Sequence, residues 1–209
     1  MPRPFFVTSA MCVAALGFYQ LATASPDRAG LILVEAESFD NTGGWTVDAQ
    51  FMDQMGSPYL LAHGLGKPVA TAETVVTFPE TGNYRVFVRT LDWVARWNVP
   101  GMPGRFALVV NGEELATKFG TTGVAWHWQA GGRVSIDRER VELKLVDQTG
   151  FEGRCDAILF VKDPEFTPAA DYRPDTVNAI EKAGEYDLVV VGGGVAGTCA
   201  AIRAARSRL

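Results

Sequence analysis

Short runs that alternate apolar and polar residues cover the chain from about residue 31 to about residue 161. They are rich in β-branched and aromatic residues, and turn sequences such as PETGN, NGEE and QTGFEG separate them, which is typical of antiparallel strands. The predicted strands lie in LILVEAE, GGWTVDAQF, TAETVVTF, NYRVFVRTLDWV, RFALVVNG, VAWHWQ, RVSI, RVELKLVD and CDAILFVK.

The alternation in two of these runs predicts which side chains face a core. In NYRVFVRTL, one face carries Tyr84, Val86, Val88 and Thr90, and the other carries Arg85, Phe87, Arg89 and Leu91. In RVELKLVD, one face carries Val141, Leu143 and Leu145, opposite Glu142, Lys144 and Val146. This spacing predicts a mainly β fold, an antiparallel β-sandwich of two sheets.

The N-terminus has the pattern of a signal peptide over residues 1–24. Arg3 gives a positive start, residues 5–21 are largely apolar, and the Ala-Thr-Ala sequence ending at Ala24 is a small-residue cleavage site. The pattern predicts export, to the periplasm or the extracellular space, with no membrane attachment after cleavage. The alternative is a retained anchor, but the apolar run is short for a membrane span.

The composition of the chain limits which classes of partner it binds and which disulfides it forms. The chain has 209 residues, 47% of them hydrophobic, and a net charge of −5, which argues against a nucleic-acid partner. Of the three cysteines, Cys12 falls in the signal peptide, and Cys155 and Cys199 fall in different predicted domains. The sequence therefore indicates no disulfide framework, and we expect the latter two to be buried small hydrophobes.

Residues 164–184 have the composition of a linker. Pro164, Pro168 and Pro174 occur in this stretch, followed by a short helical candidate over residues 175–183 that ends at Gly184. The predicted organisation is a β-sandwich over residues 25–163, this linker, and a separate element over residues 185–209.

A glycine-rich turn between an apolar run and an alanine-rich segment follows the linker. Residues 187–191 predict a buried parallel strand, and residues 195–206 predict a helix. Between them Gly192, Gly194 and Gly197 fit the G-x-G-x-x-G spacing, which allows a tight turn, close approach of a pyrophosphate and close helix packing. The pattern favours a dinucleotide site at the helix N-terminus, and the alternative is a turn without a ligand.

At these residues the chain resembles the FAD-dependent oxidoreductases, whose flavin-binding domain opens with a hydrophobic strand, a Gly-Gly-Gly turn and an AA-x-x-A-R helix. The resemblance covers about the last twenty residues and implies an FAD diphosphate at Gly192, Gly193, Gly194, Val195, Ala196 and Gly197. The acidic residue that would separate FAD from NAD is expected beyond Leu209. We therefore expect a truncated first β-α unit of a Rossmann-type domain, in a fragment that is inactive alone and whose catalytic residues are not identified.

A second resemblance covers the predicted sandwich. The opening VEAESF, the GGW that follows it and the closing CDAILF resemble the carbohydrate-binding jelly-roll modules, which have a galactose-binding-like fold. The resemblance implies a glycan ligand, and a structural calcium ion held by Glu37 and Asp156. The alternative is that both are exposed carboxylates at strand ends.

Four tryptophans are candidate ligand-binding residues. Trp93, Trp97, Trp126 and Trp128 lie in two loop-flanked stretches, and indole faces beside polar groups suit the stacking of a sugar ring. The alternative for each is core packing, because Trp126 and Trp128 share one face of a strand.

Other polar residues indicate no catalytic group. His63 and His127 lack a partner at metal-ligand or catalytic spacing, and we expect both at the surface or in hydrogen bonds. The charged loop DQTGFEGRCD is interpreted as a salt-bridged turn, although an acid/base pair is its alternative.

Two function hypotheses follow. The first is an exported FAD-dependent oxidoreductase in which the sandwich binds a glycan or a small-molecule substrate, this chain being its N-terminal part. The second is a secreted carbohydrate-binding module without catalytic activity.

Overall fold

The computed structural model describes residues 30–174, 187–190 and 194–207. The chain divides after Thr176 into two compact units. The predicted signal peptide and the helical candidate over residues 175–183 lie outside the described residues. No described helix combines the length and the apolar character that a membrane span requires.

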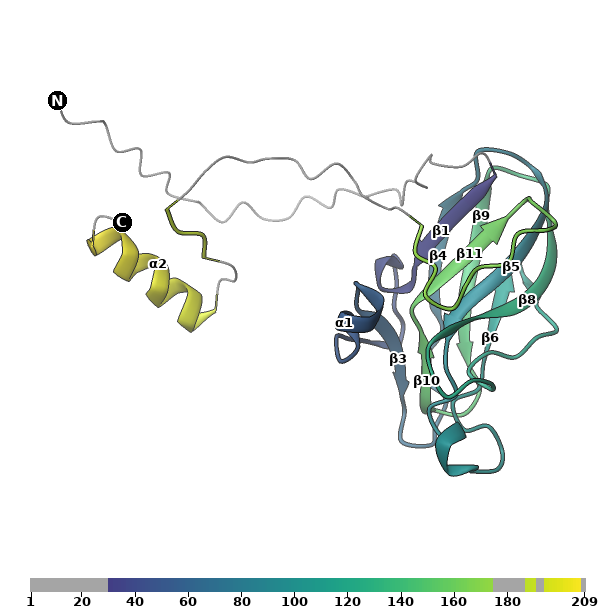
Figure 1. Ribbon diagram of the computed structural model, residues 1–209, viewed down its shortest axis with the longest axis horizontal. Helices are drawn as coiled ribbons and strands as arrows, with labels where there is room; N and C mark the ends of the chain where they lie inside the picture. Colours follow the sequence, from purple (N-terminus) through teal and green to yellow (C-terminus); the bar gives the residue numbers. More distant parts are fainter. Residues whose placement is uncertain (1–29, 175–186, 191–193, 208–209) are drawn as a thin grey trace. The chain divides into compact units, whose positions relative to one another are not determined.

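The first unit is built from antiparallel strands (Figure 1). They are β1 (Leu31–Glu35), β2 (Thr46–Asp48), β3 (Tyr59–His63), β4 (Ala72–Thr77), β5 (Gly82–Thr90), β6 (Phe106–Val110), β7 (Glu113–Glu114), β8 (His127–Ile136), β9 (Arg140–Asp147), β10 (Phe151–Cys155) and β11 (Ala157–Val161). The short helices are η1 (Ala36–Ser38), α1 (Met52–Met55) and η2 (Ala95–Trp97).

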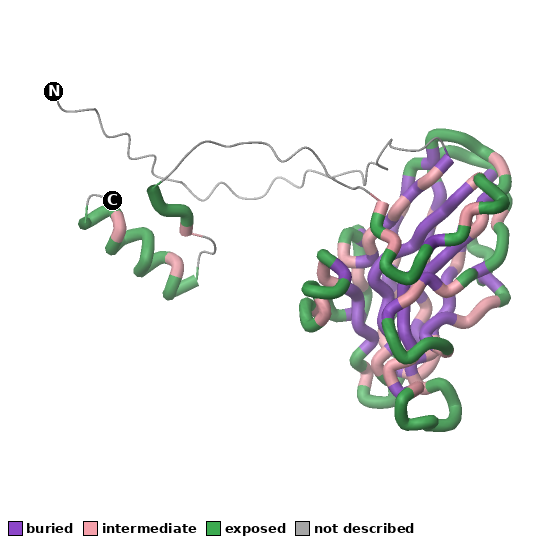
Figure 2. The backbone as a smooth tube through the Cα atoms, in the orientation of Figure 1, coloured by how far each residue is buried: buried purple, intermediate pink, exposed green. Residues whose placement is uncertain are grey.

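The strands form three sheets with the orders β1-β11-β5-β8, β4-β9-β6-β7 and β10-β3-β2. The main core draws apolar side chains from strands of all three sheets, including Val86 of β5, Leu143 of β9 and Leu60 of β3. Figure 2 shows the buried segments running through the interior of this unit, with exposed backbone at its turns and loops. The unit is therefore an antiparallel β-sandwich, which confirms the mainly β prediction. It differs from the prediction of two sheets, because β10, β3 and β2 form a third sheet.

The alternation in the sequence correctly predicts which side chains form the inner face of the sandwich. On β5, Tyr84, Val86 and Val88 are fully buried in the main core, and on β9 Leu143 and Leu145 are as well. A side chain on a strand points to the opposite face from its neighbours, so one face of each strand supplies the core.

The opposite face of β5 is also covered. Phe87 is buried in a second cluster with Trp128 and Leu159, and Phe166 and Tyr172 pack against this cluster. Residues 164–174, which the composition suggested as a linker, therefore include a segment that covers the outer face of a sheet in the first unit.

Hydrogen bonds fix this covering segment in place. Nη1 of Arg85 donates to the backbone oxygens of Pro164 at 2.8 Å and Phe166 at 2.6 Å. Nε1 of Trp128 donates to the backbone oxygen of Tyr172 at 2.9 Å. These side-chain donors are thus paired with the backbone of a segment that forms no regular secondary structure.

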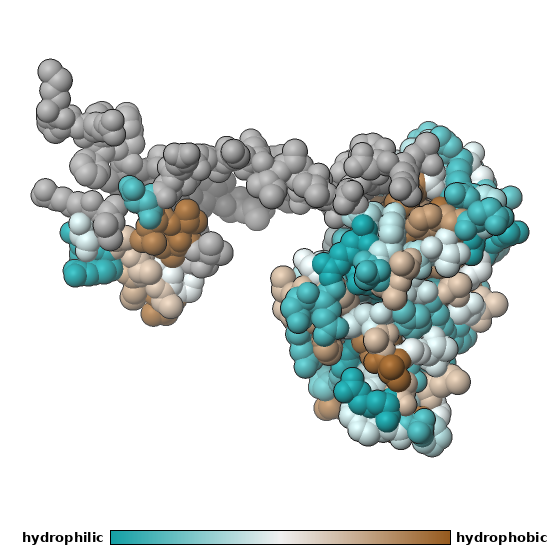
Figure 3. Space-filling view, viewed as in Figure 1, coloured by the Kyte–Doolittle hydropathy of each residue, from teal (hydrophilic) through white to brown (hydrophobic). Residues whose placement is uncertain are grey.

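The second unit contains helix α2 (Val195–Ser207), at the position the sequence predicts. Figure 3 shows apolar residues on the surface of this unit. Val195 and Ile202 on α2 are both exposed. The strand expected over residues 187–191 is not formed in its described part, residues 187–190. A strand needs a neighbour to pair its backbone groups, and no described strand pairs with this segment, so a Rossmann unit is not shown.

The two cysteines predicted to be buried differ. Cys155 of β10 is buried in the core, as expected, whereas Cys199 on α2 is exposed. The prediction was wrong for Cys199 because the described part of the second unit offers no layer against which α2 buries a face.

Candidate functional site

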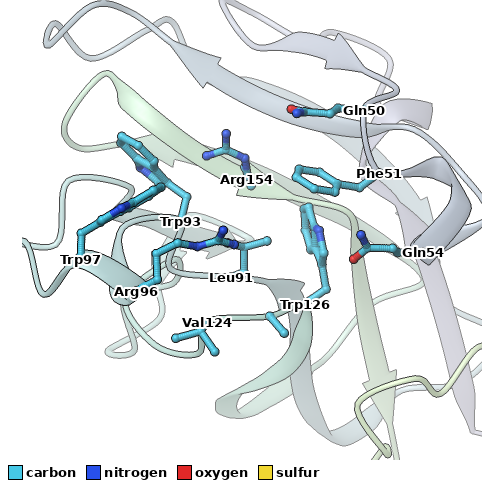
Figure 4. A pocket seen from close by; sticks show the side chains of 11 residues that line it. Gln50, Phe51, Gln54, Leu91, Trp93, Arg96, Trp97, Val124, Trp126 and Arg154 are labelled. Carbon is cyan, nitrogen blue, oxygen red and sulfur yellow. The ribbon is translucent and has the colours of Figure 1, made fainter.

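The loop after β5 and the loop before β8 enclose a pocket together with α1 and β10 (Figure 4). Its volume is about 330 Å³, near the lower end of the range for small-ligand pockets. The lining residues are Gln50, Phe51, Gln54, Leu91, Trp93, Arg96, Trp97, Val124, Ala125, Trp126 and Arg154.

Two aromatic pairs flank this pocket (Figure 4). Trp93 and Trp97 meet edge to face with centroids 6.3 Å apart, and Phe51 and Trp126 do so at 5.9 Å. The Trp97 side chain is 61% exposed although indole is large and apolar, whereas Trp126 is 8% exposed. The exposed indole leaves apolar area available to a ligand.

Local hydrogen bonds hold the two tryptophan loops together. The backbone N–H of Asp92 donates to the oxygens of Thr122 at 3.0 Å and Gly123 at 2.9 Å. Nε1 of Trp93 donates to the backbone oxygen of Phe151 at 3.0 Å, and the two rings stack at 5.6 Å. The pocket wall therefore has a defined geometry although it consists of loops.

The opposite wall depends on the short helix α1. Phe51 precedes α1 and contacts the buried ring of Tyr59, at 5.9 Å between centroids. Gly56 ends α1 with a φ of 83°, and an added Cβ there would lie 2.6 Å from Nη1 of Arg173. The left-handed φ favours glycine at this position, whereas the guanidinium of Arg173 is the flexible end of a side chain and can move. The turn that Gly56 allows ends the helix that Phe51 precedes.

The polar groups of the pocket are guanidinium and amide groups. Arg154 lies between Trp93 and Phe51 in Figure 4 and pairs with Glu152 at 3.1 Å. Arg96 lies over the ring of Trp97, at 5.2 Å from its centroid, and has no carboxylate partner among the described residues. Hydrogen-bond donors therefore stand beside apolar ring faces.

The two histidines lie as the sequence suggested. His63 pairs with Glu152, which thus contacts both His63 and Arg154. His127 contacts the hydroxyl of Thr122 and the backbone oxygen of Ala125. The ion pairs expected in the charged segment are present, but Glu152 and Arg154 lie on strand β10 and not in a turn.

The structure brings together three of the four candidate tryptophans. Trp93, Trp97 and Trp126 line the pocket, whereas Trp128 lies under the covering segment on the outer face of its sheet. The sequence analysis missed the pocket residues Gln50, Phe51, Gln54 and Arg96. Of these, only Arg96 could have been predicted, because it directly precedes Trp97 in the sequence. Residues 50–54 are far from the tryptophans along the chain, and no local pattern places them in the same pocket.

The proposed calcium ligands occupy the junction between two sheets. Asp156 separates β10 from β11 and is buried, and its carboxylate lies 3.6 Å from Nη1 of Arg89. Burial, and then the charge of Glu35, raises the pKa of Asp156 to about 7. Asp156 is therefore not the exposed strand-end carboxylate of the alternative interpretation.

Glu37 lies in η1 and is partly buried. Its Oε2 atom is buried without a hydrogen-bond partner in the described structure. Burial raises the pKa of Glu37 to about 8, with Glu35 and Asp156 acting in the same direction. Within residues 30–174, 187–190 and 194–207, no group of three or more His, Cys, Asp and Glu side chains that could hold a metal ion occurs.

The predicted diphosphate site is described only in part. Gly192 and Gly193 lie outside the described residues, and Val195, Ala196 and Gly197 form the first turn of α2. Gly194 precedes the helix, and an added Cβ there would meet nothing within 4 Å. The described residues supply the helix of the motif but not its strand.

Solved structures with a similar fold include carbohydrate-binding modules and an enzyme whose name includes one. A β-(1,4)-mannanase from Podospora anserina, named as GH26-CBM35, matches with 19% identity and a TM-score of 0.51, over 68% of this chain and 29% of that chain. A family 35 carbohydrate-binding module from Clostridium thermocellum matches with 16% identity and a TM-score of 0.49, over 62% of this chain and 96% of the module. No family model and no curated protein matches the sequence.

These matches bear on the fold alone. At 19% identity the mannanase match shows a common jelly-roll architecture, and this chain spans less than a third of that protein. The similarity agrees with the resemblance seen in VEAESF, GGW and CDAILF, and it leaves the ligand to be inferred from the pocket.

Proposed function

We propose that the first unit is a carbohydrate-binding module of an exported protein, and that its glycan ligand occupies the pocket between Trp97 and Trp126. The observation that carries this proposal is the exposed indole of Trp97 beside polar donors in a concave site. A sugar ring has an apolar C–H face and a rim of hydroxyl groups. The indole matches the face, and the guanidinium and amide groups of the pocket match the rim.

The fold similarity supports the same proposal. The matching solved structure with the TM-score of 0.51 is a mannanase whose printed name includes a carbohydrate-binding module, CBM35. The predicted signal peptide would bring this module to a compartment in which polysaccharides occur.

Affinity electrophoresis tests the proposal while the identity of the glycan is still open. The protein would migrate through native gels that contain soluble mannan, xylan, galactan or polygalacturonate. We expect at least one polysaccharide to retard the wild type and to retard the Trp93→Ala variant less. Leu65→Ala is the control, since Leu65 is an exposed apolar residue outside the pocket. Absence of retardation across a broad glycan panel would contradict the proposal.

A structural calcium ion held by Glu37 and Asp156 is part of the same proposal. The buried, unpaired Oε2 of Glu37 and the mutual repulsion of the carboxylates suit a hard cation, which would neutralise their charge. Backbone oxygens and water would supply the remaining ligands. The ion would join η1 to the β10–β11 junction.

Melting temperature measures this calcium effect. A cation that binds only the folded state raises the melting temperature, and removal by EDTA lowers it again. We expect a rise of several degrees with millimolar calcium near pH 8, and a loss of that rise in Glu37→Gln. An unchanged melting temperature would leave Arg89 as the counter-charge of Asp156.

The flavin assignment of the second unit stays a prediction. Helix α2 begins at Val195 as the G-x-G-x-x-G motif requires, but Gly194 shows no close contact that demands glycine. Flavin absorbance in the protein as purified would favour the oxidoreductase hypothesis over a module without catalytic activity.

A further inference from the structure

A second pocket adjoins the first one. Its volume is about 530 Å³, and it is lined by Asp92, Ala95, Asn98, Val99, Pro100, Gly101, Met102, Thr121, Thr122 and Gly123. These residues belong to the same two loops that carry the tryptophans of the first pocket.

Consecutive residues of each loop face different pockets. Along residues 91–98, Leu91, Trp93, Arg96 and Trp97 line the first pocket, and Asp92, Ala95 and Asn98 line the second. In the other loop the change falls between Gly123 and Val124. The two backbones, joined through the N–H of Asp92, therefore form a ridge with one pocket on each side.

Exposed apolar side chains gather on this ridge. Trp97, Val99, Met102 and Val124 are large apolar residues that remain exposed, and each lines one of the two pockets. Clustered exposed apolar residues rimmed by polar groups mark interaction sites more often than scattered ones do. Trp97 and Val124 line the first pocket, and Val99 and Met102 line the second.

The second pocket carries groups that bind hydroxyls. The amide of Asn98 can both donate to and accept from a sugar hydroxyl. The hydroxyl of Thr121 donates to the backbone oxygen of Lys118, that of Thr122 contacts His127, and one oxygen of Asp92 accepts from the N–H of Val94. The remaining lone pairs of these oxygens are acceptors for sugar hydroxyls. The first pocket, at about 330 Å³, is small for an extended ligand.

We propose that the second pocket is a further subsite for the same ligand, which is a linear oligosaccharide chain that crosses the ridge at Trp97. This inference rests on the proposed glycan-binding function. One sugar unit stacks in the tryptophan pocket, and units further along the chain bind Asn98 and the threonine hydroxyls.

Isothermal titration with oligosaccharides of increasing length tests the inference. The probes are disaccharide to hexasaccharide fragments of the polysaccharide that retards the protein most strongly. We expect the affinity to rise by about tenfold once the oligosaccharide is long enough to reach beyond the first pocket.

A variant of the second pocket separates the two subsites. Asn98 has a φ of 50°, so Asn98→Gly removes the amide while the backbone keeps its left-handed conformation. We expect a fivefold to tenfold loss of hexasaccharide affinity, on the order of one lost hydrogen bond, with unchanged disaccharide affinity. Asn111→Gly is the matched control, because Asn111 also has a φ of 50° but lines neither pocket.

The outcomes distinguish this inference from the function on which it rests. Glycan binding with equal affinity at every chain length, or an Asn98→Gly variant with wild-type hexasaccharide affinity, overturns the second subsite and leaves the module intact. Failure to bind any glycan overturns the proposed function and the subsite together.

Discussion

Trp126 and Trp128 lie two residues apart and have the same exposed fraction, 8%, yet they belong to different parts of the molecule. Trp128 lies under Phe166 and Tyr172, and its Nε1 donates to a backbone oxygen. Trp126 contacts Phe51 in the wall of a pocket, and its Nε1 has no hydrogen-bond partner in the described structure. Burial alone therefore does not separate a structural tryptophan from one at a binding site.

The residues around each ring distinguish the structural tryptophan from the one in the pocket. Trp128 is surrounded by a covering segment that completes a core cluster, whereas Trp126 lines the same pocket as Trp97, whose ring stays exposed. Substitutions around Trp128 should therefore lower stability, whereas substitutions in the pocket should lower glycan affinity.

The largest effect on stability is expected for Trp128→Ala. Removal of a buried indole leaves a cavity and an unpaired carbonyl at Tyr172, which destabilises by about 3–5 kcal/mol. Urea denaturation measures this loss. Glycan affinity at a temperature where the variant is folded should stay near the wild-type value, and a large loss of affinity there would mean that Trp128 belongs to the binding site.

Tyr172→Ala should have a smaller effect of the same kind. Tyr172 is half-buried against Trp128 and Phe166, with a ring distance of 5.2 Å to the latter, so we expect a loss of about 1–3 kcal/mol. The same denaturation experiment gives the value. Wild-type stability would mean that residues 164–174 act as a loose linker.

The pH dependence of stability probes the carboxylates at the junction of the sheets. Folding raises the pKa of Glu37 to about 8 and of Asp156 to about 7, so the folded state binds protons more tightly than the unfolded chain. Their contribution is present in full at acidic pH, below their ordinary pKa values, and is lost as the pH rises through about 7 and about 8.

In the absence of calcium we therefore expect the free energy of unfolding to be lower at alkaline pH than at acidic pH. Glu37→Gln should flatten this profile. Glu113→Gln, at an exposed position on β7, should leave it unchanged. A profile that rises with pH in the wild type would mean that the carboxylates are stabilised as anions.

The inner face of the sandwich could be predicted from the sequence because strand alternation is a local property. Val86 and Leu143 follow it directly. The outer face could not, because Phe87 and Trp128 are covered by residues 164–174, whose prolines suggested a linker.

The candidate site was predictable only in its tryptophans. Trp93 and Trp97 stand out in the sequence, but Phe51 and Arg154 reach the pocket through the pairing of β3 with β10, which is non-local. The second unit shows the opposite case, since α2 follows from local propensity whereas the expected strand depends on partners that are not among the described residues.

Trp97→Ala should have the smallest effect on stability, because the ring is 61% exposed and its removal leaves no buried cavity. Isothermal titration of this variant beside Trp128→Ala, with the polysaccharide that retards the wild type, tests the glycan site most directly. We predict that Trp97→Ala folds like the wild type and loses glycan affinity by about tenfold or more, as expected for a hot-spot aromatic residue. Wild-type affinity in Trp97→Ala would contradict the assignment of the pocket as the glycan site.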